Sequence, residues 1–138
     1  MLAVPRAVYD AVVAHAVEAA PEEACGVIGG EFEERRSTVR AVRRATNAAD
    51  APRHEYAIDP AEQLALHDEL EAAGHDVVGF YHSHPRGPAG PSGTDVERAT
   101  WPDRSYVIVD LAGEHPFVGA WRWDGAAERF VREVLDVA

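Results

Sequence analysis

The chain has 138 residues, with 24 acidic and 13 basic side chains and a formal net charge of −11 at pH 7. Its length is that of one domain, so we expect residues 1–138 to form a single domain, and 46% apolar residues are enough for a buried core. A surface with this excess of negative charge repels phosphate backbones and anionic lipid heads. Nucleic-acid and membrane binding are therefore poor hypotheses for this chain.

Cysteine content and hydropathy suggest where the protein acts. Cys25 is the only cysteine, so no disulfide can form within the chain and nothing indicates an oxidising compartment. No stretch reaches the roughly 18 apolar residues that a membrane-spanning helix needs, and the first residues do not resemble a secretion signal. We therefore expect a soluble, cytoplasmic protein.

Apolar spacing predicts the elements in chain order. Apolar residues three and four apart from Val4 to Ala20 predict a helix that Pro21 ends. The next expected elements are strands at 24–30 and 37–46, a loop at 47–53, a brief strand at 54–58 and a helix at 60–73. They are followed by a central strand at 76–84, a loop at 85–91, a short helix at 93–100, and strands at 105–111, 117–123 and 129–135. This order predicts an α/β (α+β) domain with a mixed central sheet and helices packed on it.

The most informative motif is His82-Ser83-His84-Pro85 at the end of the expected central strand. Residues two apart on a strand point to the same face, so the two histidine rings can converge on one ion. Proline at position 85 favours an extended backbone at His84, which keeps the second ring in strand geometry. The motif therefore predicts two nitrogen ligands at the C-terminal rim of the strand.

A carboxylate follows this motif across the expected loop. Two histidines and Asp95 would leave one tetrahedral position of a zinc ion free for water, which is typical of a catalytic site and not of a structural one. Ser92 and Asp95 also have the spacing of a capping box at a helix start. The two roles are compatible, because a helix start would hold the Asp95 carboxylate in place.

These residues resemble the signature of the JAMM (MPN+) family of zinc metallopeptidases, a distant Glu followed by H-[ST]-H-P, six residues and S-x-x-D. The run Glu23-Ala24-Cys25-Gly26 is similar to the family's Glu element, and the adjacent Glu22 is the alternative. The resemblance implies a single MPN-type domain with cytidine-deaminase-like architecture. It also implies one Zn²⁺ per chain.

Within the family, the chain is most similar to small prokaryotic peptidases that act on ubiquitin-like modifier or sulfur-carrier proteins ending in Gly-Gly. The implied activity is that of a desampylase-like isopeptidase or a hydrolase of sulfur-carrier–cysteine conjugates. The resemblance implies His82, His84 and Asp95 as zinc ligands. Glu23 would then be the general base and Ser92 the hydroxyl that donates to the oxyanion. We expect the extended tail of the substrate to add to an exposed sheet edge, with the loop 85–91 as one wall of its channel.

Two other interpretations remain open. A catalytically silent MPN scaffold or interaction module would share the fold, although such proteins usually lack ligands that this chain retains. A metal-binding module without hydrolysis is the other. Cys25 is expected to be a small buried residue, because nothing near it in the sequence lowers a thiol pKa and a fourth protein ligand would block the open position.

Overall fold

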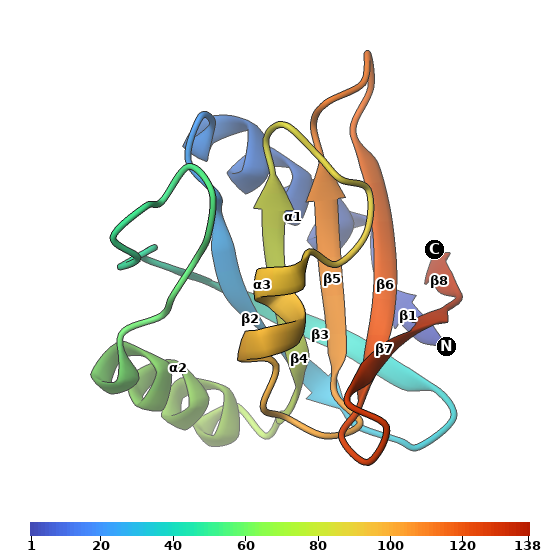
Figure 1. Ribbon diagram of the computed structural model, residues 1–138. Coiled ribbons are helices and arrows are strands. Elements are labelled where there is room, and N and C mark those ends of the chain that lie inside the picture. The colour runs from blue at the N-terminus through green and yellow to red at the C-terminus, as the bar shows by residue number, and fades with distance from the viewer.

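The computed structural model describes residues 1–138 and joins all eight strands in one mixed sheet, in the order β7-β6-β5-β4-β2-β3-β1-β8 (Figure 1). The strands are β1 (Leu2–Val4), β2 (Cys25–Glu31), β3 (Ser37–Ala45), β4 (Asp76–His84), β5 (Ser105–Asp110), β6 (Phe117–Asp124), β7 (Arg129–Glu133) and β8 (Leu135–Val137). The helices are α1 (Arg6–Ala19), α2 (Pro60–Ala72) and α3 (Gly93–Arg98). This architecture confirms the predicted α/β domain with a mixed sheet. None of the three helices is long and apolar enough to cross a membrane.

Two hydrophobic clusters cover the two faces of the sheet. Val12 and Ala16 of α1 pack with Tyr81 of β4 in one cluster. Leu70 of α2 packs with Phe80 of β4 in the other. Successive side chains of a strand point to opposite faces, so the even-numbered residues of β4 lie on the α2 face. The two histidines of β4 therefore lie beyond Phe80 on the side of the sheet that carries α2.

The segment at 54–58 is not a strand, and this prediction is wrong. It forms turns and coil, because its main chain pairs with a side chain instead of a neighbouring strand. Asn47 accepts a hydrogen bond from the N–H of Ala57 (3.2 Å) and donates one to the carbonyl oxygen of Glu55 (2.9 Å). One side-chain amide thus takes the place of strand pairing.

The two ends of the chain also differ from the prediction. Val4 belongs to β1, so the first helix begins at Arg6, and the apolar stripe of the helix is shorter than expected. The predicted strand at 129–135 is divided at Val134 into β7, which pairs with β6, and β8, which pairs in parallel with β1. Consecutive strands therefore occupy the opposite ends of the sheet.

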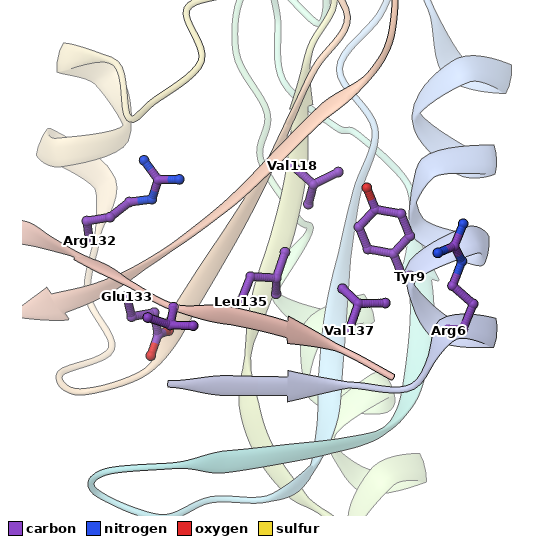
Figure 2. Close-up of a pocket in the computed structure, with 8 residues that line it drawn as sticks. Arg6, Tyr9, Val118, Arg132, Glu133, Leu135 and Val137 are labelled. Carbon is purple, nitrogen blue, oxygen red and sulfur yellow. The ribbon is translucent and has the colours of Figure 1, made fainter.

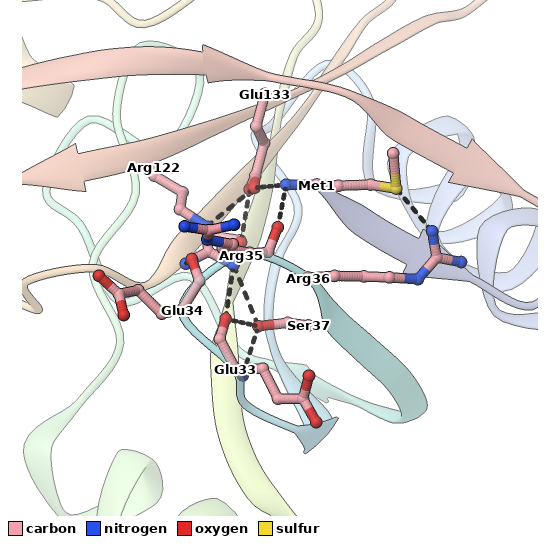
Figure 3. A network of polar contacts seen from close by, with 9 residues as sticks. Met1, Glu33, Glu34, Arg35, Arg36, Ser37, Arg122 and Glu133 are labelled. Atoms are coloured by element: carbon pink, nitrogen blue, oxygen red, sulfur yellow. Dashed lines mark hydrogen bonds and ion pairs between the residues drawn. The ribbon is translucent and has the colours of Figure 1, made fainter.

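Arg122 of β6 connects distant parts of the fold (Figure 3). Its guanidinium pairs with Glu133 of β7 at 2.9 Å and donates to the carbonyl oxygens of Glu33 and Glu34 in the turn between β2 and β3. The Glu133 side chain is only 6% exposed. A buried carboxylate without a partner is costly, so this pair holds the β6–β7 hairpin against the turn.

Candidate metal centre

Three side chains converge where β4 ends. The Nε2 atoms of His82 and His84 lie 3.1 Å apart, and each lies 3.1 Å from a carboxylate oxygen of Asp95 in the first turn of α3. Ligands at 2.0–2.1 Å from a tetrahedral zinc ion lie roughly 3.3 Å from one another. Two nitrogens and a carboxylate at this spacing therefore fit a single metal ion.

The two histidine rings are held in different ways. His84 Nδ1 lies 2.8 Å from the carbonyl oxygen of Pro88, which can only accept, so Nδ1 carries a proton and Nε2 is the nitrogen that faces Asp95 and that a metal would use. His82 Nδ1 is buried without a hydrogen-bond partner. Its ring is instead stacked on Tyr56, with centroids 4.4 Å apart and planes at 25°. The orientation of His82 therefore depends on an aromatic neighbour.

Asp95 is held by the helix start that the sequence predicts. The main-chain N–H of Ser92 donates to its Oδ2 at 2.8 Å, and its own N–H donates to Ser92 Oγ at 3.1 Å. This is the capping box, so one carboxylate both caps α3 and faces the two histidines. Because Ser92 Oγ accepts in this bond, its hydroxyl hydrogen is available to another acceptor.

Glu23, immediately before β2, lies beside the histidines. One of its carboxylate oxygens lies within 4.8 Å of a ring nitrogen of both His82 and His84, yet no ion pair forms. Its side chain is buried, and Oε1 has no hydrogen-bond partner. Glu22 is exposed to solvent. The structure therefore brings Glu23, and not Glu22, to the cluster.

The electrostatics separate the two carboxylates. Burial raises the pKa of Glu23 to about 7, whereas hydrogen bonds from both histidines hold the pKa of Asp95 well below its usual range in spite of burial. Burial also lowers the pKa of His82. For His84, burial opposes the charged form, but Asp95 and the Pro88 carbonyl outweigh it and the pKa is raised. Asp95 is thus ionised beside the histidines, while Glu23 titrates near neutral pH.

Two residues of the site were not assigned a role from the sequence. Tyr56 lies in the segment predicted as a strand, and Asn47 in the loop before it. Their signal was weak: an asparagine among small residues is typical of a side chain that satisfies nearby main-chain groups. Cys25 is fully buried, and burial raises the pKa of its thiol to about 12, so the predicted packing role agrees with its surroundings.

A hollow in the surface lies away from the candidate metal centre at the end of β4. It has a volume of about 580 Å³ and lies between α1 and the β7–β8 connection, lined by Arg6, Tyr9, Val118 and Arg132 among others (Figure 2). None of its lining residues belongs to the metal cluster. The chemistry of the site is therefore built at the end of β4 and not in this hollow.

An α/β domain with this donor set beside a buried glutamate is compatible with a metal site, and comparison with known proteins gives the family. The family of prokaryotic homologs of the JAB domain matches residues 5–124. The chain therefore belongs to this family, as the resemblance of its motifs implied.

Named relatives and solved structures agree with this assignment. The chain is 42% identical to a desampylase of Haloferax volcanii over 120 residues, which cover 84% of this chain and 83% of the relative. It is 40% identical to the CysO-cysteine peptidase of Mycobacterium tuberculosis over 110 residues, 77% of this chain and 70% of the relative. A solution structure of a protein from Desulfitobacterium hafniense superimposes with a TM-score of 0.89 at 29% identity, covering 100% of this chain and 93% of that one. A JAB1/MPN domain protein from Archaeoglobus fulgidus shares the fold, with a TM-score of 0.58 at 16% identity, covering 100% of this chain and 97% of that one.

Proposed function

We propose that this chain is a zinc-dependent peptidase that hydrolyses the amide bond after the C-terminal Gly-Gly of a ubiquitin-like modifier or sulfur-carrier protein. Family membership and relatives named as a desampylase and a CysO-cysteine peptidase make the chain a peptidase of such conjugates. The observation that carries the proposal is the set of two ring nitrogens 3.1 Å apart, each 3.1 Å from an oxygen of the Asp95 carboxylate, next to a buried carboxylate that pairs with none of these groups.

His82, His84 and Asp95 would hold one zinc ion. When bound, zinc supplies Lewis-acid activation of a water molecule and of the scissile carbonyl. Imidazole nitrogens and a carboxylate are ligands that zinc accepts, and three protein ligands leave one position open. The low pKa of Asp95 and the burial of His82 favour the deprotonated forms that metal binding requires.

Glu23 would act as general base and then as general acid. Its carboxylate takes a proton from the water as the water oxygen attacks the carbonyl carbon, and returns that proton to the amine as the C–N bond breaks. A buried carboxylate beside the ligands that pairs with none of them suits both steps, and such catalysis is worth about 10²- to 10⁴-fold in rate. Ser92 would donate its hydroxyl hydrogen to the oxyanion between the two steps.

The leaving group distinguishes the two kinds of relative. A desampylase-like activity would release a target lysine, and a sulfur-carrier hydrolase would release cysteine. We infer a narrow channel for the glycines between the loop 85–91 and the coil 54–58, because these segments flank the histidines from two sides through Pro88 and Tyr56. A cytoplasmic location is part of this proposal, as the cellular place of such conjugates.

The test uses a ubiquitin-like protein ending in Gly-Gly, joined either to cysteine or to the side chain of a lysine peptide. The zinc-loaded chain should cleave at least one conjugate, and a chelator should abolish the cleavage. Glu23→Gln should reduce kcat by about 10²-fold or more, with Glu22→Gln as a matched control that stays within about twofold of wild type. Zinc content should be unchanged in both variants.

Two results would overturn the proposal in different ways. If Glu23→Gln binds one zinc and cleaves as fast as wild type, the assigned mechanism is wrong. If the zinc-loaded wild-type chain cleaves neither conjugate, the silent scaffold becomes the better interpretation.

A further inference from the structure

Asn47 makes an unusual number of contacts for one side chain. It is the only asparagine in the chain and lies in the coil between β3 and α2. Its Nδ2 donates to three main-chain carbonyl oxygens, those of Glu55 (2.9 Å), Glu23 (3.1 Å) and Pro52 (3.3 Å). Its Oδ1 accepts from two main-chain N–H groups, those of Ala49 (3.0 Å) and Ala57 (3.2 Å). A primary amide has two N–H donors and two acceptor lone pairs, so these five contacts use its full capacity, with one N–H shared between two carbonyl oxygens.

On one side, these contacts hold the main chain around the carboxylate of Glu23. The carbonyl oxygen of Glu23 accepts from Asn47, and its N–H donates to the carbonyl oxygen of Pro52 at 2.7 Å. The next N–H, that of Ala24, donates to Ser83 Oγ at 2.7 Å. Because Pro52 is itself bonded to Asn47, two of these three anchors depend on the same amide.

On the other side, Asn47 holds the residues that flank Tyr56. It bonds to the carbonyl oxygen of Glu55 and to the N–H of Ala57, one residue before and one after the aromatic ring. This segment has no strand pairing. Its other contacts are a main-chain hydrogen bond from Ala48 to the carbonyl oxygen of Ala57 (2.8 Å) and exposed contacts of Arg98 with Glu55 and with the carbonyl oxygen of Tyr56. The His82 ring packs on the ring of Tyr56, and His82 Nδ1 has no hydrogen-bond partner that would orient it instead.

We propose that Asn47 is a positioning residue that holds the carboxylate of Glu23 and the ring of Tyr56 in fixed places relative to each other. It thereby couples the general base to the support of His82. The inference rests on the proposed function, in which Glu23 moves the proton. Asn47 acts through Glu23 and Tyr56 and does not touch the substrate or the metal ligands.

The kinetic test compares Asn47→Ala with a control at Glu62, the side chain that holds the adjacent residue Thr46. Removing groups that orient metal ligands and bases typically costs 10- to 100-fold, so we expect kcat of Asn47→Ala to fall by about that factor while KM stays within about threefold. In the control Glu62→Ala, the hydrogen bond to the N–H of Thr46 (2.8 Å) is lost but Glu23 and Tyr56 keep their contacts. Its kcat should stay within about twofold of wild type.

A double-mutant cycle separates positioning from general destabilisation. If Asn47 acts partly through Glu23, Asn47→Ala should lower the residual rate of Glu23→Gln by a clearly smaller factor than it lowers the rate of wild type, because coupled residues do not have additive effects. An equal loss in both backgrounds would contradict the inference. Asn47→Asp serves as the second variant if Asn47→Ala folds poorly, because it keeps the acceptor for Ala49 and Ala57, loses the donors and turns a negative charge toward the three carbonyl oxygens.

Hydrogen exchange gives a readout that needs no substrate. In Asn47→Ala, the amides of Glu23 and Ala57 should exchange at least about tenfold faster than in wild type, while that of Val27 in β2 is unchanged. The Glu23 amide is the informative one, because Asn47 does not contact it directly. Unchanged exchange at Glu23 would overturn the inference. If wild type cleaves no conjugate, the proposed function fails, and the exchange result still decides whether Asn47 holds both segments.

Discussion

At the scale of single residues, a different contact fixes each side chain of the candidate metal centre, which consists of His82, His84 and Asp95. His84 is fixed by a carbonyl oxygen, Asp95 by a helix start and His82 by an aromatic ring. Each of these supports comes from a different segment, and all three leave the ligand atoms free to face one another. The donor set is therefore preorganised before any metal arrives.

Metal removal should destabilise the protein. An ion that binds only the folded chain adds about 4.1 kcal/mol to its stability at a concentration 1,000 times its Kd. We expect a chelator to lower the Tm of wild type and of His115→Ala, whose side chain is exposed and outside the cluster. The Tm of His82→Ala should not respond to zinc or chelator. A zinc-dependent Tm in His82→Ala, measured by calorimetry, would mean that the metal binds elsewhere.

The thiol of Cys25 should be chemically inert in the folded protein. A pKa of about 12 leaves almost no thiolate at pH 7.5, and the side chain is fully buried. Iodoacetamide should therefore add nothing to the native protein and one adduct after unfolding in urea, as read by mass spectrometry. Cys25→Ala should retain the activity of wild type. Rapid native alkylation would contradict the burial of this residue.

At the scale of elements, the sequence predicted the helices and strands whose bounds are set by residues close to them in the chain. The bounds of β4 follow from its apolar run and from the proline after it, and the start of α2 follows from Pro60 as its first residue. The strands β1 and β8 have three residues each, too few to show an alternation of apolar and polar residues. They form because residues from the two ends of the chain pair with each other in parallel. The segment 54–58 has strand-like residues, but the side chain of Asn47 satisfies its main chain instead.

The packing of α2 gives a matched test of burial on one helix. Leu70 is fully buried against Gly29 of β2, whereas Leu64 is 63% exposed. Leu70→Ala should lower the free energy of unfolding by about 2–5 kcal/mol, because it leaves a cavity in the core. The identical change at Leu64 should cost less than about 0.5 kcal/mol. Urea unfolding measures both, and similar losses would show that α2 packs on the sheet by another face.

In the candidate site too, local patterns could be predicted from the sequence and contacts between distant segments could not. The spacing of His82, His84 and Asp95 along a strand, a loop and a helix start was readable because each position has a local geometric meaning. The contacts of Asn47 with Glu23 and of Tyr56 with His82 join segments far apart in the sequence. No local pattern predicts such contacts, since they depend on where the coil lies once the sheet has formed.

At the scale of the whole molecule, the pair Arg122–Glu133 should be a main point of stability. Arg122→Met would remove one charged partner of the buried Glu133 carboxylate, which should cost about 1.5–3 kcal/mol, the range for a hydrogen bond to a charged group, because the Met1 ammonium (3.2 Å) and Ser105 still contact it. Arg6→Met breaks a pair whose side chains are 70% and 61% exposed, and should cost less than about 1 kcal/mol. Equal costs in urea unfolding would contradict this role of Arg122.

The order of strands has a consequence for how a protein tail reaches the histidines. Adjacent strands lie about 4.8 Å apart, so β7 is roughly 14 Å and β8 roughly 19 Å from β4 across the sheet. A tail that extended either outermost strand would place its last bond more than a nanometre from the reacting centre. Pairing with an outermost strand therefore does not bring the end of the tail to the histidines. An inner edge is nearer, because β1 pairs only with Ser37 and Thr38 and leaves the rest of that edge of β3, two strands from β4, without a strand partner.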